Sequence, residues 1–324
     1  MNKSIDSKVK VLFTGTSGFA VPILQKLAQS TNVEMVGVVT QPDRPVGRHH
    51  ADLQPSAVGG IAMEIGYNKG FEVYKPEKLA EEAEVILENT KPELVVVASY
   101  GQMIPEPMLK YPKYGCINVH ASILPKLRGA VPIPMAIFQD FEKTGVSFQK
   151  MVKKLDAGDV IASYEVDLEG SETTETLTKK LSDLAAEKMD EVIYGWVNGE
   201  LKSVPQVESK ATYCSQKEIA KSQAKVLPTM KVDHVERMVR AFYPWPVAWG
   251  FVDFNGEKKR LKIFEARVVN SPERTLNVEE SDVLKISAEN GKLFLDLVEG
   301  KLELLEIQLE GKERKPASEY LFLA

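Results

Sequence analysis

The sequence predicts an α/β protein, with a mostly parallel sheet in its N-terminal part and a small β-barrel in its C-terminal part. Short apolar runs alternate with helical patterns between residues 9 and 139, and such alternation is typical of βαβ units. Residues 94–99 form a continuous β-branched run (LVVVAS), as expected for a strand covered on both faces. Short strands separated by Asn-Gly and Glu-Gly turns after residue 247 predict the barrel.

The elements of the sheet follow in chain order. A strand is expected at 9–14, where the turn Gly15-Thr16-Ser17-Gly18 leads into a helical pattern with Ile23, Leu24 and Leu27. Further strands are expected at 33–39, 71–74, 94–99 and 115–120, and helices at 76–89 and 133–139. The Gly15–Gly18 turn lacks the full Gly-x-Gly-x-x-Gly pattern, and no acidic residue closes the second strand. A nicotinamide dinucleotide is therefore not expected as a cofactor.

The pattern changes after residue 143. Strands at 144–152 and 159–167, joined by the loop 153–158, predict a hairpin, and the capping sequence at 171–174 precedes a long amphipathic helix. The polar segment 201–221 is interpreted as a linker. A helix at 232–242 and strands at 248–254, 261–269, 283–287, 292–297 and 301–308 follow. We expect a first domain at 1–200 and a barrel domain at 222–324.

Composition excludes some classes of protein. The 324 residues carry a net charge of −5, so no overall positive field attracts nucleic acid and any RNA contact must come from a local patch. Cys116 and Cys214 are too few and too far apart for a disulfide framework or a metal pattern. The N-terminus is short and polar, and no apolar run approaches the roughly 20 residues that span a bilayer. We expect a soluble, cytoplasmic protein.

A polar cluster is expected at the end of the strand 115–120. Side chains alternate along a strand, so Asn118 and His120 point to one face while Ile117 and Val119 point to the other. In an α/β sheet ligands bind beyond the carboxyl ends of the strands. An amide and an imidazole side by side at such an end can hydrogen-bond a developing oxyanion.

A second polar motif lies in the loop of the predicted hairpin. Small residues flank Asp156, so a substrate could approach its carboxylate, which could orient His120 and relay a proton. Each of these residues also has a structural interpretation: an Asn or His at a strand end is commonly a capping residue, and an Asp before Ala-Gly-Asp commonly forms a turn. His49 and His50 lack a third metal ligand nearby, so no metal is expected.

These motifs resemble those of a known family. Residues 118–129 (NVHASILPKLRG) are similar to the signature of the formyltransferases that use 10-formyltetrahydrofolate, and residues 155–159 (LDAGD) are similar to its second motif. Asn118, His120 and Asp156 match the catalytic triad of the family in order and spacing. The resemblance implies a Rossmann-like sheet, an OB-like barrel and a folate donor held by two segments, represented by Ser122, Ile123, Leu124 and Pro125 and by Tyr100, Gly101 and Ile104.

Three further segments resemble the members that act on initiator methionyl-tRNA: residues 40–48, 99–105 and 240–246. The resemblance implies contact of Arg44 and Arg48 with the tRNA and a tRNA-binding role for the barrel. We also expect a monomer. The family loop usually continues with a Gly and two lysines, whereas Arg48 is followed here by His-His-Ala-Asp. The positive charge of this loop is correspondingly lower.

Three other functions stay open from the sequence. An amino-sugar or nucleotide formyltransferase would share the polar cluster but would not need the 41–48 loop or the barrel. A non-catalytic RNA-binding protein would use the barrel and would fail a folate-dependent formylation assay. A hydrolase that passes the formyl group to water would differ only in its product.

Overall fold

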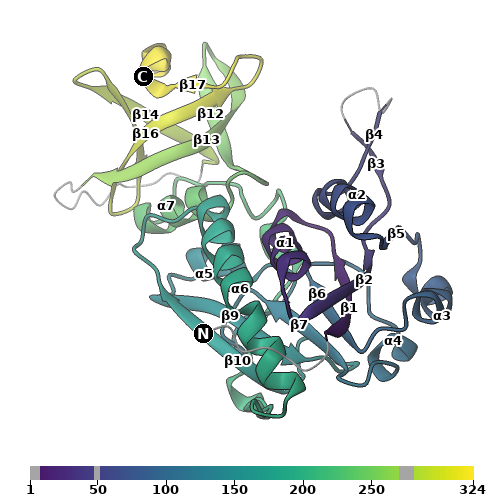
Figure 1. Ribbon diagram of the computed structural model, residues 1–324. Helices are drawn as coiled ribbons and strands as arrows, with labels where there is room; N and C mark the ends of the chain where they lie inside the picture. Colours follow the sequence, from purple (N-terminus) through teal and green to yellow (C-terminus); the bar gives the residue numbers. More distant parts are fainter. Residues whose placement is uncertain (1–7, 47–51, 270–280) are drawn as a thin grey trace. The chain divides into compact units, whose positions relative to one another are not determined.

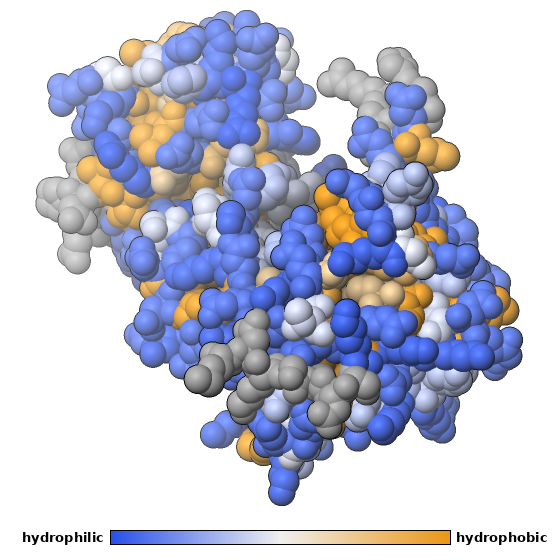
Figure 2. Space-filling model, in the orientation of Figure 1, coloured by the Kyte–Doolittle hydropathy of each residue, from blue (hydrophilic) through white to orange (hydrophobic). Residues whose placement is uncertain are grey.

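The computed structural model describes residues 8–46, 52–269 and 281–324. The chain divides into two compact units. The first unit contains the chain up to Gly129 together with Thr144–Val166 and Thr178–Tyr213, and the second contains Ala130–Lys143, Asp167–Leu177 and Cys214–Ala324. Figure 2 shows that hydrophilic residues cover most of the face drawn, with hydrophobic residues in separate patches.

The first unit is built on one sheet. Within the described residues its strands lie in the order β10-β9-β7-β6-β1-β2-β5. The pairs β1–β2, β1–β6, β6–β7 and β2–β5 are parallel, while β9 is antiparallel to β7. The predicted, mostly parallel sheet is thereby confirmed. The bounds are β1 (Val9–Gly15), β2 (Val33–Val39), β5 (Glu72–Tyr74), β6 (Leu94–Ala98), β7 (Cys116–His120), β9 (Lys143–Lys150) and β10 (Val160–Asp167).

Helices flank this sheet (Figure 1). They are α1 (Val21–Gln29), α2 (Ala57–Lys69), α3 (Leu79–Thr90), α4 (Glu106–Lys110) and most of α6 (Thr174–Val197). The helix α6 lies beside α1, since Ser182 Oγ donates to Phe19 O at 2.7 Å and Lys26 pairs with Asp190 at 3.2 Å. The helices α3 and α4 bury Leu79, Ile86 and Met108 in a core cluster with alternate side chains of the strands, namely Leu12, Val39, Val95, Val97 and Cys116.

The helix α2 is absent from the sequence-based expectation. Its pattern is weak because Gly59 and Gly60 stand in its first turn, and glycine disfavours helix by about 1 kcal/mol relative to alanine. Ser56 compensates at the N-terminus, where its Oγ accepts a hydrogen bond from Gly59 N at 2.9 Å. The left-handed Gly70 (φ 75) ends the helix.

The chain order changes direction across the sheet between β1 and β6. The chain runs outward from β1 through β2 to β5, then returns to β6 and continues to β7 on the other side. Ligands in open α/β sheets bind at the carboxyl ends of the strands on either side of such a point. There, Thr16 Oγ1 donates to Tyr100 O at 2.9 Å and Ser17 Oγ donates to Ser99 Oγ at 2.8 Å.

The second unit holds a closed barrel of β12 to β16. Closure follows because β13 pairs with β12 along one edge and with β16 along the other. The predicted barrel is confirmed. Its strands are β12 (Ala248–Phe254), β13 (Glu257–Val269), β14 (Val283–Glu289), β15 (Lys292–Leu297) and β16 (Gly300–Leu309), with β17 (Lys315–Pro316) added to β16. The same unit contains α5 (Pro132–Phe138) and α7 (Val232–Ala241), which pack through stacked Phe138 and Phe242.

Short elements complete the chain: the hairpin of β3 (Arg44–Val46) and β4 (Asp52–Gln54), the two-residue strands β8 (Arg128–Gly129) and β11 (Tyr213–Cys214), and four 3-10 turns. Over the described ranges, no helix is long and apolar enough to cross a membrane.

Candidate active site

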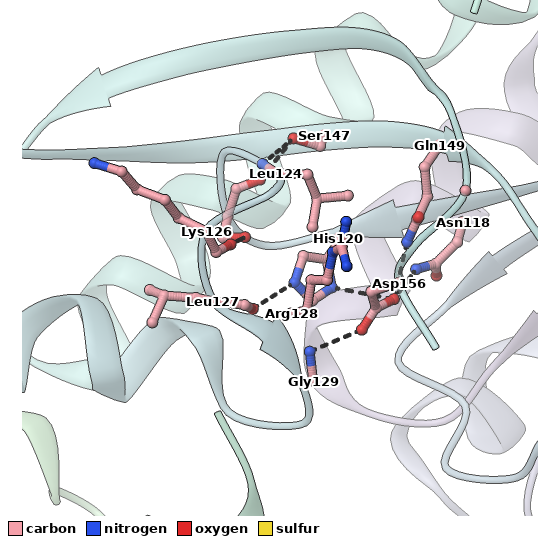
Figure 3. A network of polar contacts seen from close by, with 12 residues as sticks. Asn118, His120, Leu124, Lys126, Leu127, Arg128, Gly129, Ser147, Gln149 and Asp156 are labelled. Atoms are coloured by element: carbon pink, nitrogen blue, oxygen red, sulfur yellow. Dashed lines mark hydrogen bonds and ion pairs between the residues drawn. The ribbon is translucent and has the colours of Figure 1, made fainter. Parts of the chain in front are cut away.

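The structure brings Asn118, His120 and Asp156 together. Asn118 and His120 lie on one face of β7, and Asp156 comes from the loop between β9 and β10 (Figure 3). Asn118 Nδ2 donates to Asp156 Oδ1 at 3.2 Å, and His120 Nδ1 lies 3.7 Å from the same oxygen. The His120 and Asp156 side chains are only 6% and 8% exposed, so their charges and dipoles act with little screening by water.

The Asp156 carboxylate accepts three hydrogen bonds. Besides Asn118, Gln149 Nε2 donates to Oδ1 at 2.8 Å and Gly129 N donates to Oδ2 at 2.8 Å. Gln149 is in place because β9 pairs antiparallel with β7, which sets Gln149 directly opposite Asn118. A carboxylate can only accept hydrogen bonds, and all three of these bonds come from N–H groups. Asp156 also has a left-handed backbone (φ 47), uncommon outside glycine.

The orientation of His120 is set by a backbone carbonyl. His120 Nε2 lies 2.9 Å from Leu127 O, and a carbonyl can only accept, so Nε2 carries a proton. In the neutral ring Nδ1 is then the unprotonated nitrogen, and it faces Asp156. At 3.7 Å the Nδ1–Oδ1 separation exceeds a hydrogen bond. In this structure the His120 ring is hydrogen-bonded to Leu127 O, and Asp156 lies within ion-pair distance of Nδ1.

The segment from Ser122 to Pro125 leaves β7 beside this cluster and is held by its own hydrogen bonds. Ser147 Oγ accepts from Leu124 N at 3.0 Å and donates to Ser122 O at 2.7 Å. Ser122 Oγ donates to Lys126 O at 2.6 Å. Ser122 and Leu124 are buried, whereas Ile123 and Pro125 are half-buried. This loop is a fixed wall beside the cluster.

The other expected donor-binding segment follows β6. The side chains of Tyr100 and Ile104 are buried in the core cluster, so only their backbone could meet a ligand. Burial, with a smaller contribution from Glu82, raises the pKa of Tyr100 to about 12. Its hydroxyl has no hydrogen-bond partner among the described residues. Gly101 is exposed and has φ 92, a conformation that favours glycine.

Of the two arginines expected to contact tRNA, the structure describes Arg44 and not Arg48. Arg44 begins β3 and forms a bidentate pair with Glu77, at 2.8 and 3.3 Å. Both side chains are well exposed, 60% and 68%, so water screens this pair and its contribution to stability is small. Arg48 lies outside the described residues, as do His49 and His50.

Sequence reasoning missed several groups around the cluster. Gln149 could have been suspected, because Ser147 and Gln149 alternate with apolar residues in the strand and both prove buried. Gln206 and Thr212 carried no signal, since they stand in the polar segment interpreted as a linker. Arg128 was visible only as a member of a motif, yet its side chain is fully buried and pairs with Glu208 at 2.9 Å.

Glu208 forms ion pairs with Arg128 and Lys154 next to the cluster. Hydrogen bonds from Lys154 and then Arg128 hold the pKa of Glu208 at about 2, well below its usual range. Arg128 Nη1 also donates to Tyr213 Oη at 3.1 Å. A buried guanidinium is thereby matched by a carboxylate and a phenol, as buried charge requires.

Neither a metal centre nor the cavity described below competes with this site among the described residues. The described residues contain no group of three or more His, Cys, Asp and Glu that could hold a metal ion. A cavity of about 340 Å³ lies between residues 109–115, Lys150 and Trp196. Gly115 precedes the first residue of β7, so this cavity is at the end of the strand opposite His120.

Comparison with known sequences defines the class of protein. Residues 7–193 match the family described as formyl transferase, and residues 218–322 match the formyl transferase C-terminal domain. The chain therefore belongs to the formyl transferase family.

Its relatives include methionyl-tRNA formyltransferases along almost their full length. The enzyme of Bacillus subtilis is 38% identical over 314 residues, which cover 96% of this chain and 94% of that protein. The enzyme of Bacillus velezensis is 36% identical over 317 residues, with coverage of 96% and 94%.

Solved structures share the fold at lower identity. The N-formyltransferase of Helicobacter canadensis, in complex with folinic acid and dTDP-3-aminofucose, has a TM-score of 0.64 at 15% identity and covers 91% of this chain and 98% of that one. HypX of Aquifex aeolicus in complex with tetrahydrofolic acid has a TM-score of 0.61 at 16% identity, covering 98% of this chain and 48% of that one. At these identities the likeness concerns the fold alone.

Proposed function

We propose that this protein transfers the formyl group of 10-formyltetrahydrofolate to the α-amino group of methionine on initiator methionyl-tRNA. The observation that carries the proposal is the polar cluster of Asn118, His120 and Asp156 in a chain that matches methionyl-tRNA formyltransferases over 96% of its length. The product would be N-formylmethionyl-tRNA, used in translation initiation.

The surfaces around the cluster suit a folate donor. Exposed Gly101 leaves the backbone after β6 uncovered by a side chain, and half-buried Ile123 and Pro125 offer apolar surface after β7. Apolar walls with a few backbone polar groups are what a flat heteroaromatic ring needs. Since β6 and β7 are parallel neighbours, both segments leave the same edge of the sheet. The donor, when bound here, would supply an activated formyl group, and no metal is needed.

The polar cluster would stabilise the charge that develops during transfer. A free α-amino group has a pKa of roughly 7.7–8.0, so a substantial fraction is already a neutral nucleophile near pH 7.5. The harder task is to stabilise the oxyanion formed from the formyl oxygen. We assign this task to Asn118 and to His120, whose Nδ1 can donate to the oxyanion only while it carries a proton, because Nε2 donates to Leu127 O. The Asn118 amide has two N–H donors and Asp156 engages one of them, which leaves the second for the oxyanion.

Asp156 would manage the proton of the attacking amine. Its carboxylate lies beside both Asn118 and His120 Nδ1. A group in this position can accept a proton from the amine and pass it toward the departing nitrogen, directly or through water. His120 Nδ1 is the ring nitrogen beside this carboxylate, because Nε2 is bonded to Leu127 O.

For the tRNA we assign contacts to Arg44 and Arg48 and to the barrel. On the barrel, Trp249 and Phe251 lie edge to face at 5.3 Å between centroids, with Arg260 over Trp249 at 4.7 Å and Lys258 over Phe251 at 4.3 Å. Cations interleaved with half-exposed aromatic rings are typical of surfaces that stack nucleic-acid bases. This local patch would supply what the net charge of −5 does not.

The proposal includes the cellular location and the oligomeric state of the protein. An acceptor used in translation supports a cytoplasmic protein, and a site formed within one chain supports a monomer. Light scattering after gel filtration should give a mass near 36.0 kDa. A dimer at assay concentrations would contradict the expected monomer.

The direct experiment incubates the purified protein with 10-formyltetrahydrofolate and methionyl-tRNA and measures formylmethionine after hydrolysis of the ester. Elongator methionyl-tRNA and an amino-sugar nucleotide serve as alternative acceptors, and free formate reports transfer to water. Product on initiator tRNA supports the proposal. Product only on the sugar, or only formate, would sink it.

Variants connect the activity with the cluster. Asn118→Ala and His120→Ala should each lower kcat by about 10²–10³-fold, the usual effect of losing one oxyanion donor. Circular dichroism checks folding. Arg48→Glu should raise the KM for tRNA and leave that for the folate donor unchanged. An equal rise in both KM values would mean that this arginine is structural.

A further inference from the structure

A single segment, residues 204–213, bonds both to the loop that contains Asp156 and to the turn that contains Leu127, the partner of His120. We call this segment the strap. It lies within the stretch that sequence reasoning interprets as a linker. We propose that the strap is a positioning element of the active site: Gln206 fixes the backbone of Asp156, and Thr212 fixes the Leu127 carbonyl that orients His120. The proposal rests on the proposed formyl transfer, and it goes beyond the three residues of the cluster.

Gln206 ties the Asp156 loop to Arg128. Its Nε2 donates to Asp156 O at 2.9 Å and to Gly158 O at 2.6 Å, while its Oε1 accepts from Arg128 Nε at 3.0 Å. Both N–H groups and the oxygen of this amide are used. The two carbonyls flank the left-handed turn that presents the Asp156 carboxylate. The Gln206 side chain therefore links that loop to β8, in addition to the direct bond from Gly129 N to Asp156 Oδ2.

Thr212 holds the turn that ends in Leu127. Its N–H donates to Pro125 O at 3.2 Å, its Oγ1 accepts from Leu127 N at 2.8 Å, and its carbonyl accepts from Arg128 N at 2.9 Å. Leu127 has φ 55, which is an outlier for a bulky residue. Such a conformation persists only where the surroundings over-determine it. The three bonds to Thr212 provide that determination, and Leu127 O is thereby aimed at His120 Nε2.

The strap is itself anchored to the rest of the first unit at two further points. Val204 and Val160 exchange backbone hydrogen bonds at 2.8 and 2.9 Å. Farther along, Glu208 receives Arg128 at 2.9 Å and Lys154 at 2.6 Å. The strap is thus fixed against β10, the β9–β10 loop and β8. Its polarity, the very property that suggested a linker, is used in these contacts.

Loss of a strap contact would displace the side chains of the cluster slightly, and such small displacements affect turnover more than substrate binding. Misplacing a catalytic group by about 1 Å can lower the rate by about 100-fold. The strap side chains bond to Leu127, Arg128, Asp156 and Gly158, which carry or adjoin the cluster. Loss of a strap contact should therefore lower kcat and leave the KM for both substrates nearly unchanged.

Matched variants test each contact. Thr212→Val keeps the shape and both backbone bonds but removes the acceptor for Leu127 N, whereas Thr212→Ser keeps the hydroxyl. Gln206→Glu keeps an acceptor for Arg128 but cannot donate to the two carbonyls. We expect kcat to fall about 10- to 100-fold in Thr212→Val and Gln206→Glu, and to return to within about threefold of wild type in Thr212→Ser. The control is Ser203→Ala, whose hydroxyl is 3.5 Å from Asp159 Oδ2 and does not reach the cluster.

A spectroscopic readout separates positioning from a general loss of structure. The chain has four histidines, so ¹⁵N-histidine labelling gives few signals and His120→Ala identifies the one from His120. In wild type the His120 signals should show Nε2 protonated and Nδ1 unprotonated when the ring is neutral. In Thr212→Val the second tautomer should become populated, with thermal unfolding close to that of Ser203→Ala.

The outcomes distinguish the two proposals. If wild type forms no formylated product, the proposed function fails, while the histidine spectra still test the strap. If wild type is active and both strap variants keep its kcat and its His120 spectrum, the strap proposal is overturned. An equal loss in Thr212→Ser and Thr212→Val would also overturn it, because the hydroxyl would then be irrelevant.

Discussion

Replacing Asp156 by Asn should destabilise the first unit as well as slow transfer. The carboxylate accepts two N–H groups at Oδ1 and one at Oδ2, and its side chain is only 8% exposed. An Asn side chain has one oxygen. In its best orientation that oxygen keeps the donors Asn118 and Gln149, and its NH₂ then faces the N–H of Gly129. One buried donor is left unpaired and another is added.

The magnitude follows from these contacts. A hydrogen bond to a charged acceptor contributes about 1.5–3 kcal/mol, and an unpaired buried donor costs about 1–3 kcal/mol. Removing a buried charge relieves part of its desolvation penalty and offsets some of this loss. We expect the free energy of unfolding to fall by about 2–3 kcal/mol. We expect kcat to fall by about 10²–10⁴-fold, the usual range for losing a general acid–base.

The assay follows the first unit alone. In a background with Trp245→Phe and Trp249→Phe, the remaining Trp196 reports on urea unfolding of the first unit. The matched control is Asp159→Asn in the same loop, since the Asp159 carboxylate accepts a long hydrogen bond of 3.5 Å from Ser203 Oγ and the backbone bond from Lys150 N is kept. If Asp156→Asn unfolds within about 0.5 kcal/mol of this control, the range of ordinary surface substitutions, the reasoning from its three donors is refuted.

Three further predictions concern buried groups. Gly158→Ala would place a Cβ 1.8 Å from Lys150 O, so we expect a stability loss of about 1–3 kcal/mol and lower kcat; wild-type Tm and kcat would contradict this. Burial raises the pKa of Cys116 to about 12, so iodoacetamide at pH 8 should modify it only after unfolding, as mass spectrometry can check. The pKa of Tyr100 is raised to about 12, so its phenol stays neutral when folded but ionises near pH 10 when unfolded. Stability should therefore fall between pH 10 and 12, by at most about 1.4 kcal/mol per unit from this group, and Tyr100→Phe should show a smaller fall in urea titrations.

Much of the fold could be predicted from the sequence because its strands are strongly patterned. The strands β2, β12 and β15 have the expected bounds, and most others agree to within two residues. The helix α2 was missed because its glycines weaken the pattern and its start depends on the cap from Ser56. The strands β8, β11 and β17 have two residues each. Each is recognised as a strand only because it pairs with another segment, and local periodicity does not predict such pairing.

The candidate site was predictable in part for the same reason. Alternation along β7 placed Asn118 and His120 on one face, the small residues of the predicted hairpin loop pointed to Asp156, and motif resemblance joined the three. The groups that hold them could not be found this way, because Gln149, Gln206 and Thr212 meet the cluster only through tertiary pairing. Nothing in the sequence near His120 indicates that a carbonyl seven residues later accepts its Nε2 proton. Such contacts depend on backbone conformation at Leu127, where a leucine gives no warning of a positive φ.

The position of the strap in the chain also bears on synthesis and on protein engineering. Gln206, which bonds to Asp156 O, follows Asp156 by 50 positions and is separated from it by β10 and α6. As the chain emerges from the ribosome, β7 and the β9–β10 loop can pair long before the strap arrives. A fragment ending at residue 200 would contain Asn118, His120 and Asp156 yet lack the segment that fixes two of them. A minimal catalytic fragment should therefore extend through Tyr213, and fusions or cleavage sites between the units belong after that residue.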